Sequence, residues 1–103
     1  MTKACILSVS GPDLTPAEAA LFAAEQPWGV ILMGRSCVSR GQVRKLVDDI
    51  WNSMKRQCLI FIDQEGGRVA RLKAPEWPLF PRGFDYADLY AKDAEAGREA
   101  VWL

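Results

Sequence analysis

The sequence predicts an α/β fold in which three parallel strands alternate with helices. Three short apolar runs, at residues 4–10, 29–33 and 59–62, have the length and composition of strands. The two segments between them each open with the Ser/Thr-x-x-Glu/Gln pattern that begins a helix. Right-handed crossovers between such elements make the strands parallel and bring their carboxyl ends to one edge of the sheet.

The first predicted helix begins beside a turn signal. Residues 11–13 read Gly-Pro-Asp and end the first strand, and Thr15 and Glu18 then form a capping box. Each side chain of the box can satisfy a backbone amide of the other residue. The helix is expected to end before Pro27, because proline cannot continue it.

The second strand and helix follow the same pattern. Residues 29–33 are apolar at every position except Gly29, as in strands that are buried on both faces of a parallel sheet. Ser39 and Gln42 form a second predicted capping box. Beyond it an apolar stripe recurs at helical spacing and predicts core packing rather than binding; its members are Val43, Leu46, Val47, Ile50, Trp51 and Met54.

The third strand, residues 59–62, runs directly into a polar segment. This segment, residues 63–71, reads DQEGGRVAR and carries two carboxylates, a glycine pair and two arginines. Residues 73–85 are rich in proline and aromatic side chains and predict an irregular loop. A helix is expected from about Asp88 to Leu103.

The polar segment is the candidate binding site, because α/β proteins place their chemistry at the carboxyl ends of strands. Asp63 and Glu65 are two residues apart, so both carboxylates point to one side of an extended backbone. An arginine nearby would hold one of them ionised and could donate hydrogen bonds to sugar hydroxyls or to an anion. A capped turn with a surface ion pair is the simpler alternative.

Composition narrows the class of protein. The chain has 103 residues, of which 50% are hydrophobic and 25% charged, which is typical of one globular domain or part of one. Thirteen basic and thirteen acidic residues balance without blocks of like charge, so we expect neither a nucleic-acid nor a membrane partner. The absence of histidine and the wide spacing of the three cysteines argue against a zinc site and favour reduced thiols in a cytoplasmic protein.

The predicted sheet has two open edges made of Val, Ile, Leu and Phe. Native proteins seldom leave such edges unpaired. We therefore expect the chain to form the first three units of a larger α/β assembly, and self-association through the exposed edges is a second expectation.

The run at residues 63–69, following a third strand, resembles glycoside hydrolase family 3, in particular its bacterial β-N-acetylhexosaminidases. Residues 29–32 with Arg35 resemble the second strand of that family and its loop, and residues 79–81 resemble a proline-containing segment after its third strand. The resemblance covers residues 4–83 and departs at Ser36, where the family usually has asparagine.

The resemblance implies that residues 1–103 are the amino-terminal part of a TIM (β/α)8 barrel from a retaining enzyme. Such enzymes remove terminal N-acetylglucosamine from peptidoglycan fragments in the cytoplasm, without a cofactor. Carried over by position, Asp63 and Arg71 would bind the terminal sugar, and the segment that shapes the loop would consist of Glu65, Gly66, Gly67 and Arg68. The catalytic aspartate and histidine of the family lie on later strands, so no catalytic residue is assigned here and the isolated chain is expected to be inactive.

Two other functions remain open from the sequence. The chain could be a non-catalytic carbohydrate-binding or self-associating barrel fragment. Alternatively, Asp63 and Glu65 could form a metal site or an independent acid/base pair, although no further ligand lies at a useful spacing.

Overall fold

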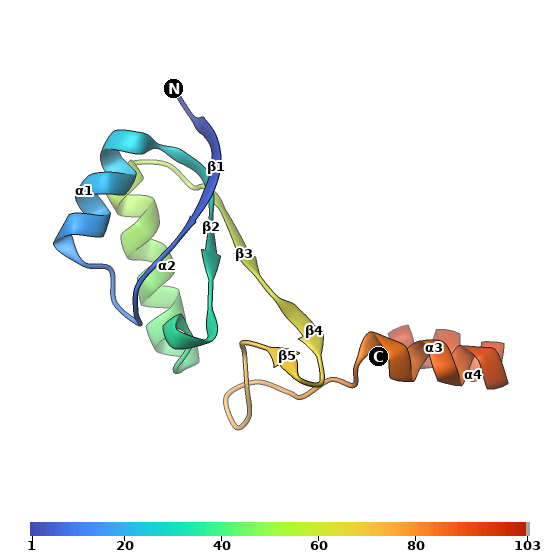
Figure 1. Ribbon diagram of the computed structural model, residues 1–103. Coiled ribbons are helices and arrows are strands. Elements are labelled where there is room, and N and C mark those ends of the chain that lie inside the picture. Colours follow the sequence, from blue (N-terminus) through green and yellow to red (C-terminus); the bar gives the residue numbers. More distant parts are fainter. Residues whose placement is uncertain (103) are drawn as a thin grey trace. The chain divides into compact units, whose positions relative to one another are not determined.

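The computed structural model describes residues 1–102, which form two compact units, Met1–Asp63 and Gln64–Leu103, with Leu103 itself outside the described residues. Figure 1 shows the course of the chain and the labels of its elements. Each unit is considered by itself below.

The first unit contains a three-stranded parallel sheet with two helices. Its elements are β1 (Lys3–Ser8), α1 (Pro16–Glu25), β2 (Pro27–Leu32), the short 3₁₀ helix η1 (Gly34–Ser36), α2 (Arg40–Met54) and β3 (Leu59–Ile62). The strands lie in the order β1-β2-β3, and both pairs are parallel. The predicted order of strands and helices in this unit is therefore confirmed.

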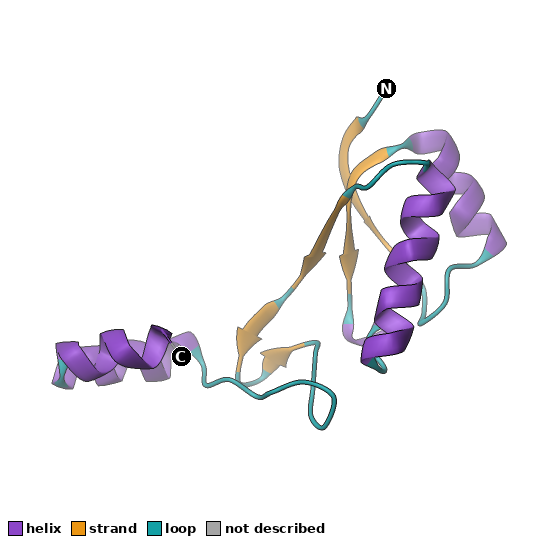
Figure 2. Ribbon diagram, turned by 180° about the vertical axis from the view of Figure 1, so that it is seen from behind, coloured by secondary structure: helices purple, strands orange, loops and turns teal. Residues whose placement is uncertain are grey.

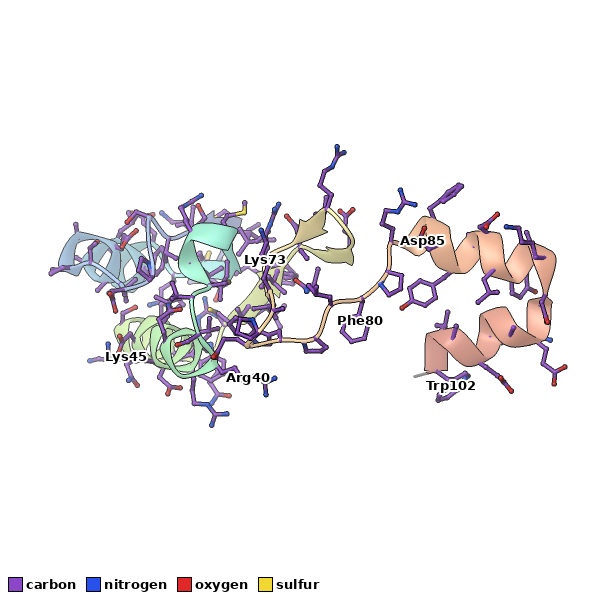
Figure 3. All side chains as sticks on the ribbon, turned by 90° about the horizontal axis from the view of Figure 1, so that it is seen from below. Arg40, Lys45, Lys73, Phe80, Asp85 and Trp102 are labelled. Carbon is purple, nitrogen blue, oxygen red and sulfur yellow. The ribbon has the colours of Figure 1, made fainter. Side chains whose placement is uncertain are left out.

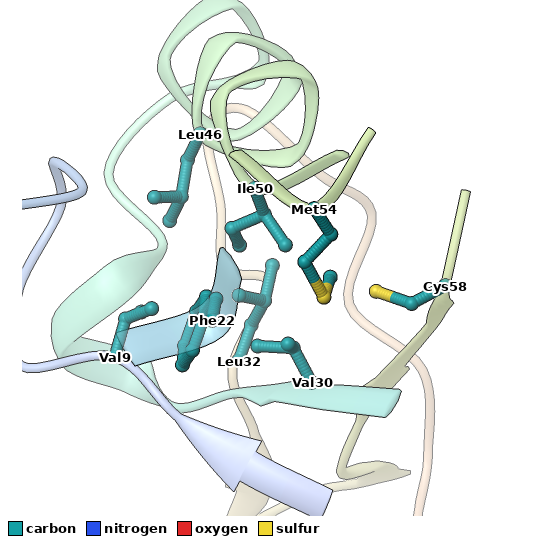
Figure 4. Packing of buried hydrophobic residues seen from close by; sticks show 8 residues of the cluster. All are labelled: Val9, Phe22, Val30, Leu32, Leu46, Ile50, Met54 and Cys58. Carbon is teal, nitrogen blue, oxygen red and sulfur yellow. The ribbon is translucent and has the colours of Figure 1, made fainter. Parts of the chain in front are cut away.

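Both helices cover the same face of the sheet, as Figures 1 and 2 show from opposite sides. The core lies between this face and the helices (Figure 4), and its buried members are Val9, Phe22, Val30, Leu32, Leu46, Ile50, Met54 and Cys58. Helices on one face, with strand order equal to chain order, are the arrangement of a barrel wall rather than of an open sheet with helices on both faces.

The other face of the sheet has no covering element within this unit. The strand register aligns Ile6, Gly29 and Leu59 on this face, and residues Ile6 and Leu59 are 44% and 50% exposed. The Phe61 ring lies over Gly29, where a Cβ atom would come within 2.6 Å of the ring. The expectation that these strands are buried on both faces is thus wrong for this unit, because both of its helices pack against the opposite face.

The helix starts follow the capping signals, with one difference. Thr15 and Glu18 form the complete predicted box. Ser39 accepts from the backbone amide of Gln42 at 3.2 Å, but the Gln42 side chain does not return to Ser39. It accepts from the amide of Val38 at 2.9 Å and donates to the carbonyl of Ser36 at 3.0 Å. Gln42 therefore ties α2 to the loop after β2 instead of closing a box.

The second unit combines a small hairpin with two helices. β4 (Gln64–Gly66) and β5 (Val69–Ala70) pair antiparallel, and α3 (Gly83–Lys92) and α4 (Ala94–Trp102) follow the irregular segment. The hairpin was not predicted, because its strands are too short to carry a periodic pattern.

The predicted helix from about Asp88 to Leu103 is wrong in its start and its continuity, and Leu103 lies outside the described residues. Helix α3 begins five residues earlier than expected, and the chain is extended at Asp93. The Asp93 carboxylate accepts from the amides of Glu95 and Ala96, so this residue caps a separate helix. The two helices approach closely at Gly97, where a Cβ atom would lie 2.5 Å from the Cα of Tyr90.

Candidate functional site

The carboxyl end of the first unit's sheet carries Asp63 and a cross-strand arginine contact. Asp63 follows β3 directly and is half-buried. Arg35, in η1 after β2, reaches back to the end of β1: its Nε donates to the carbonyl of Val9 at 3.0 Å and its Nη2 to the Ser8 hydroxyl at 3.2 Å. Arg35 thus fixes the loop after β2 to the neighbouring strand. Sequence reasoning placed it in the loop but gave it no such contact.

Ser36 stands at the position where the resemblance to the family departs. The side chain is fully buried, and its hydroxyl has no hydrogen-bond partner among residues 1–102. The backbone of Ser36 is well satisfied, since its amide donates to the carbonyl of Met33 at 2.8 Å and its carbonyl accepts from Gln42. At Ser36 the loop is therefore held through its backbone amide and carbonyl rather than through its hydroxyl.

In the second unit, Gln64 fixes the backbone around Arg71. Its side-chain oxygen accepts from the amides of Arg71 and Leu72 at 2.9 and 3.0 Å, and its amide nitrogen donates to the carbonyl of Leu72 at 2.9 Å. Sequence reasoning missed this role, although an amide with both donors and acceptors inside a binding motif is a usable signal.

The glycine pair turns the hairpin onto the segment before α3. Gly66 and Gly67 have φ angles of +86° and +56°, which favour glycine. A Cβ atom would lie 2.1 Å from the carbonyl oxygen of Pro81 at Gly66, and 2.2 Å from the Cγ of Arg82 at Gly67. The amide of Gly67 also donates to the carbonyl of Phe80 at 3.0 Å. Larger residues would displace these contacts.

Glu65 and Arg68 are both exposed and lie on opposite sides of this turn in sequence. They line a groove of about 600 Å³ within the second unit, together with Gly66, Val69, Arg82, Gly83 and Phe84. The predicted pairing of Glu65 with Asp63 is not assigned, because these residues belong to different units. The sugar-binding and loop-shaping roles of the segment stay predictions.

Residues 1–102 contain no cluster of three or more histidine, cysteine or carboxylate side chains that could hold a metal ion. Within the same range, no helix has both the length and the hydropathy needed to cross a membrane.

Known proteins similar to this chain are bacterial glycosidases. The β-hexosaminidase of Mannheimia succiniciproducens is 38% identical over 101 residues, a match that spans 95% of this chain and 29% of the relative. That of Thioalkalivibrio sulfidiphilus is 34% identical with the same coverage. The chain is homologous to the amino-terminal region of the bacterial β-hexosaminidases. It spans less than a third of their length.

Solved structures agree with this homology. NagZ from Neisseria gonorrhoeae matches with a TM-score of 0.82 and 25% identity over 89% of this chain and 28% of its own. A family 3 β-N-acetylglucosaminidase from Paenibacillus matches with a TM-score of 0.75 and 27% identity, over 92% of this chain and 18% of its own. The resemblance to glycoside hydrolase family 3 and the predicted fold class, the first β/α units of a TIM barrel, are confirmed. No protein-family model matches the β-hexosaminidase-like chain.

Proposed function

We propose that this chain supplies the sugar-binding amino-terminal part of a retaining β-N-acetylhexosaminidase. The substrate would be a saccharide with a terminal N-acetylglucosamine, such as a peptidoglycan fragment in the cytoplasm. The observation that carries the proposal is the position of Asp63, directly after β3 at the carboxyl end of the sheet, in a chain homologous to β-hexosaminidases. One of the similar solved structures is a complex of NagZ with N-trifluoroacetyl-D-glucosamine.

In this proposal Asp63 accepts hydrogen bonds from sugar hydroxyls and Arg71 donates to the same ring. A carboxylate and a guanidinium are suited to these roles because charge-assisted hydrogen bonds are stronger than neutral ones. Gln64 would be a positioning residue, since it holds the backbone of Arg71.

The described residues would bind and position a sugar, but they do not complete a double displacement. Such a reaction needs a nucleophile and an acid/base group on opposite sides of the glycosidic bond. The chain has no histidine, and it covers 29% of its relatives. We therefore expect no hydrolysis of an aryl N-acetyl-β-glucosaminide by the purified chain. Turnover that disappears in Asp63→Asn would contradict this assignment of roles.

Binding is tested by amide NMR of the full chain with N-acetylglucosamine. The amide chemical shifts of Asp63 and Arg71 should change and reach saturation as the sugar is added. Asp63→Ala should weaken binding by about 10- to 150-fold, because it removes one or two charge-assisted hydrogen bonds. Asp48→Asn, an exposed charge removal on α2, is the control and should bind normally. Equal affinity in Asp63→Ala would refute the site.

A second candidate is a non-catalytic, self-associating barrel fragment. The observation that favours it is the uncovered face of the first unit's sheet, where Ile6 of β1 is 44% exposed and Leu59 of β3 is 50% exposed, both on outer strands. Light scattering after gel filtration at several concentrations separates the two candidates. A mass that stays at one chain excludes self-association, and a mass that doubles with concentration supports it.

A further inference from the structure

The groove in the second unit, outside the proposed terminal-sugar residues, has the features of a second saccharide site. The groove is lined by residues of the hairpin, Glu65, Gly66, Arg68 and Val69, and by residues at the start of α3, Arg82, Gly83 and Phe84. Its volume, about 600 Å³, lies in the range of small-ligand pockets. The Gly66–Gly67 turn holds the two walls together, since the amide of Gly67 donates to the carbonyl of Phe80.

One wall of the groove is an ordered aromatic platform. The Asp85 carboxylate accepts two hydrogen bonds from the Arg82 guanidinium, at 2.6 and 3.1 Å, and a third from the backbone amide of Arg82. The guanidinium of Arg82 in turn lies over the Phe84 ring, 5.7 Å from its centroid. Asp85 is labelled at the start of α3 in Figure 3. Phe84 makes this contact although the residue is 70% exposed.

The opposite wall supplies one acceptor and one set of donors. Gln64 turns its side chain toward Leu72, so the next residue of β4, Glu65, faces the other side of the strand. Its carboxylate can accept from hydroxyl groups, and the five N–H groups of Arg68 can donate to them.

The charges of the groove cancel and favour a neutral ligand. Glu65 offsets Arg68, and Asp85 offsets Arg82 through the contacts above. A free anion or cation gains little from such a site. A sugar ring fits better, because it presents an apolar C–H face to an aromatic ring and hydroxyl groups to a carboxylate and a guanidinium.

We propose that this groove binds a saccharide ring, with Phe84 as the stacking surface and with Glu65 and Arg68 as hydrogen-bonding partners. The inference rests on the proposed function for its ligand class, and it assigns a sugar site to residues other than Asp63 and Arg71. All three groove residues are exposed, so substitutions there should leave the fold intact.

The test is amide NMR of the full chain with N,N′-diacetylchitobiose. We expect saturable shifts at residues 65–69 and 83–84, and Phe84→Leu should weaken the affinity read from these shifts about tenfold by removing the ring. Phe80→Leu is the matched control: this phenylalanine is 51% exposed, precedes α3 and does not line the groove. Arg68→Gln should weaken the same affinity and leave the shifts at Asp63 in place.

The outcomes separate this inference from the proposed function. Shifts at Asp63 with none in the groove would overturn the inference and leave the proposed function standing. Shifts in the groove that respond to Phe84→Leu, with none at Asp63, would support the inference and count against the proposed terminal-sugar site. Equal losses of disaccharide affinity in Phe84→Leu and Phe80→Leu would also overturn the inference. So would a collapsed spectrum that the disaccharide leaves unchanged, because the groove depends on the contact between the Gly66–Gly67 turn and the segment before α3.

Discussion

Ionisation of Glu18 at the start of α1 makes the stability of the folded chain depend on pH. Its carboxylate accepts from the amide of Ser10 at 2.7 Å, from the amide of Thr15 at 2.9 Å and from the Thr15 hydroxyl at 2.7 Å. Partial burial of Glu18 opposes ionisation, but the hydrogen bonds from Thr15 and Ser10 together outweigh it and lower the pKa from 4.5 to about 2. The folded chain therefore stabilises the ionised form of Glu18 more than the unfolded chain does.

The size of this effect follows from the difference between the two pKa values. A carboxyl with a folded pKa of about 2 and an unfolded value of 4.5 contributes at most ~3.4 kcal/mol. Because Glu18 is partly exposed and its contacts are screened, we expect about 1–2 kcal/mol. The folded pKa is the lower one, so the contribution is complete above pH 4.5 and is lost as the pH falls toward 2.

The assay is urea unfolding of the full chain and of Glu18→Gln at pH 7, 4 and 2.5, followed by circular dichroism. The variant should be less stable than the parent chain by about 1–2 kcal/mol at pH 7, and the difference should shrink steadily at the lower pH values. Asp48→Asn, which removes an exposed carboxylate from α2, should change stability by less than about 0.5 kcal/mol. A difference for Glu18→Gln that is absent at pH 7, or equal at all three pH values, would refute the reasoning.

Three further substitutions test other parts of the chain. Lys55 follows the last residue of α2 with a φ of +53°, so Lys55→Gly should raise the free energy of unfolding by about 0.5–1 kcal/mol. Gln57→Gly, where φ is not positive, should lower it. Urea melts in which Lys55→Gly destabilises the chain as much as Gln57→Gly does would contradict this. Ser36→Ala removes a buried hydroxyl that has no partner within residues 1–102 and should be neutral or stabilising by about 1 kcal/mol in the same melts; a clear loss would show that the hydroxyl is bonded. Gly97→Ala should lower the free energy of unfolding by about 1–3 kcal/mol, because the added methyl group would push α4 away from Tyr90. The α4 amides should then exchange their hydrogens faster, and unchanged exchange would disprove the close packing.

The sequence predicts the first unit well because its signals are local. Apolar runs of strand length and the Thr15 capping box each act within a few residues, and they fix the three strands and two helices. These local signals do not show which face of the sheet the helices cover. Ile31 is as apolar as Val30, so periodicity cannot tell which of the two faces the helices. Burial on one face only emerges from the packing of α1 against α2 over the sheet.

The second unit was predicted less well because its structure depends on single contacts. A hairpin with strands of three and two residues has no periodicity, and it is held by the Gln64 side chain and by the turn docked on Pro81. The break at Asp93 likewise depends on one carboxylate that caps α4. In the candidate site, the motif indicated Asp63 and Arg71, but the contacts of Arg35 and Gln64 depend on residues distant in sequence or on side-chain rotamers.

The identity of strand order and chain order in the first unit has a consequence for biosynthesis. Each strand pairs with the one that leaves the ribosome just before it: β2 with β1, and β3 with β2. Within the first unit, β2 and β3 each pair with a strand that has already been made, so these two pairings can proceed at the rate of translation, about 5–20 residues per second. The sheet of this unit can therefore grow one strand at a time: the outer edge of β1 stays open throughout, and the other edge moves to each new strand as it pairs.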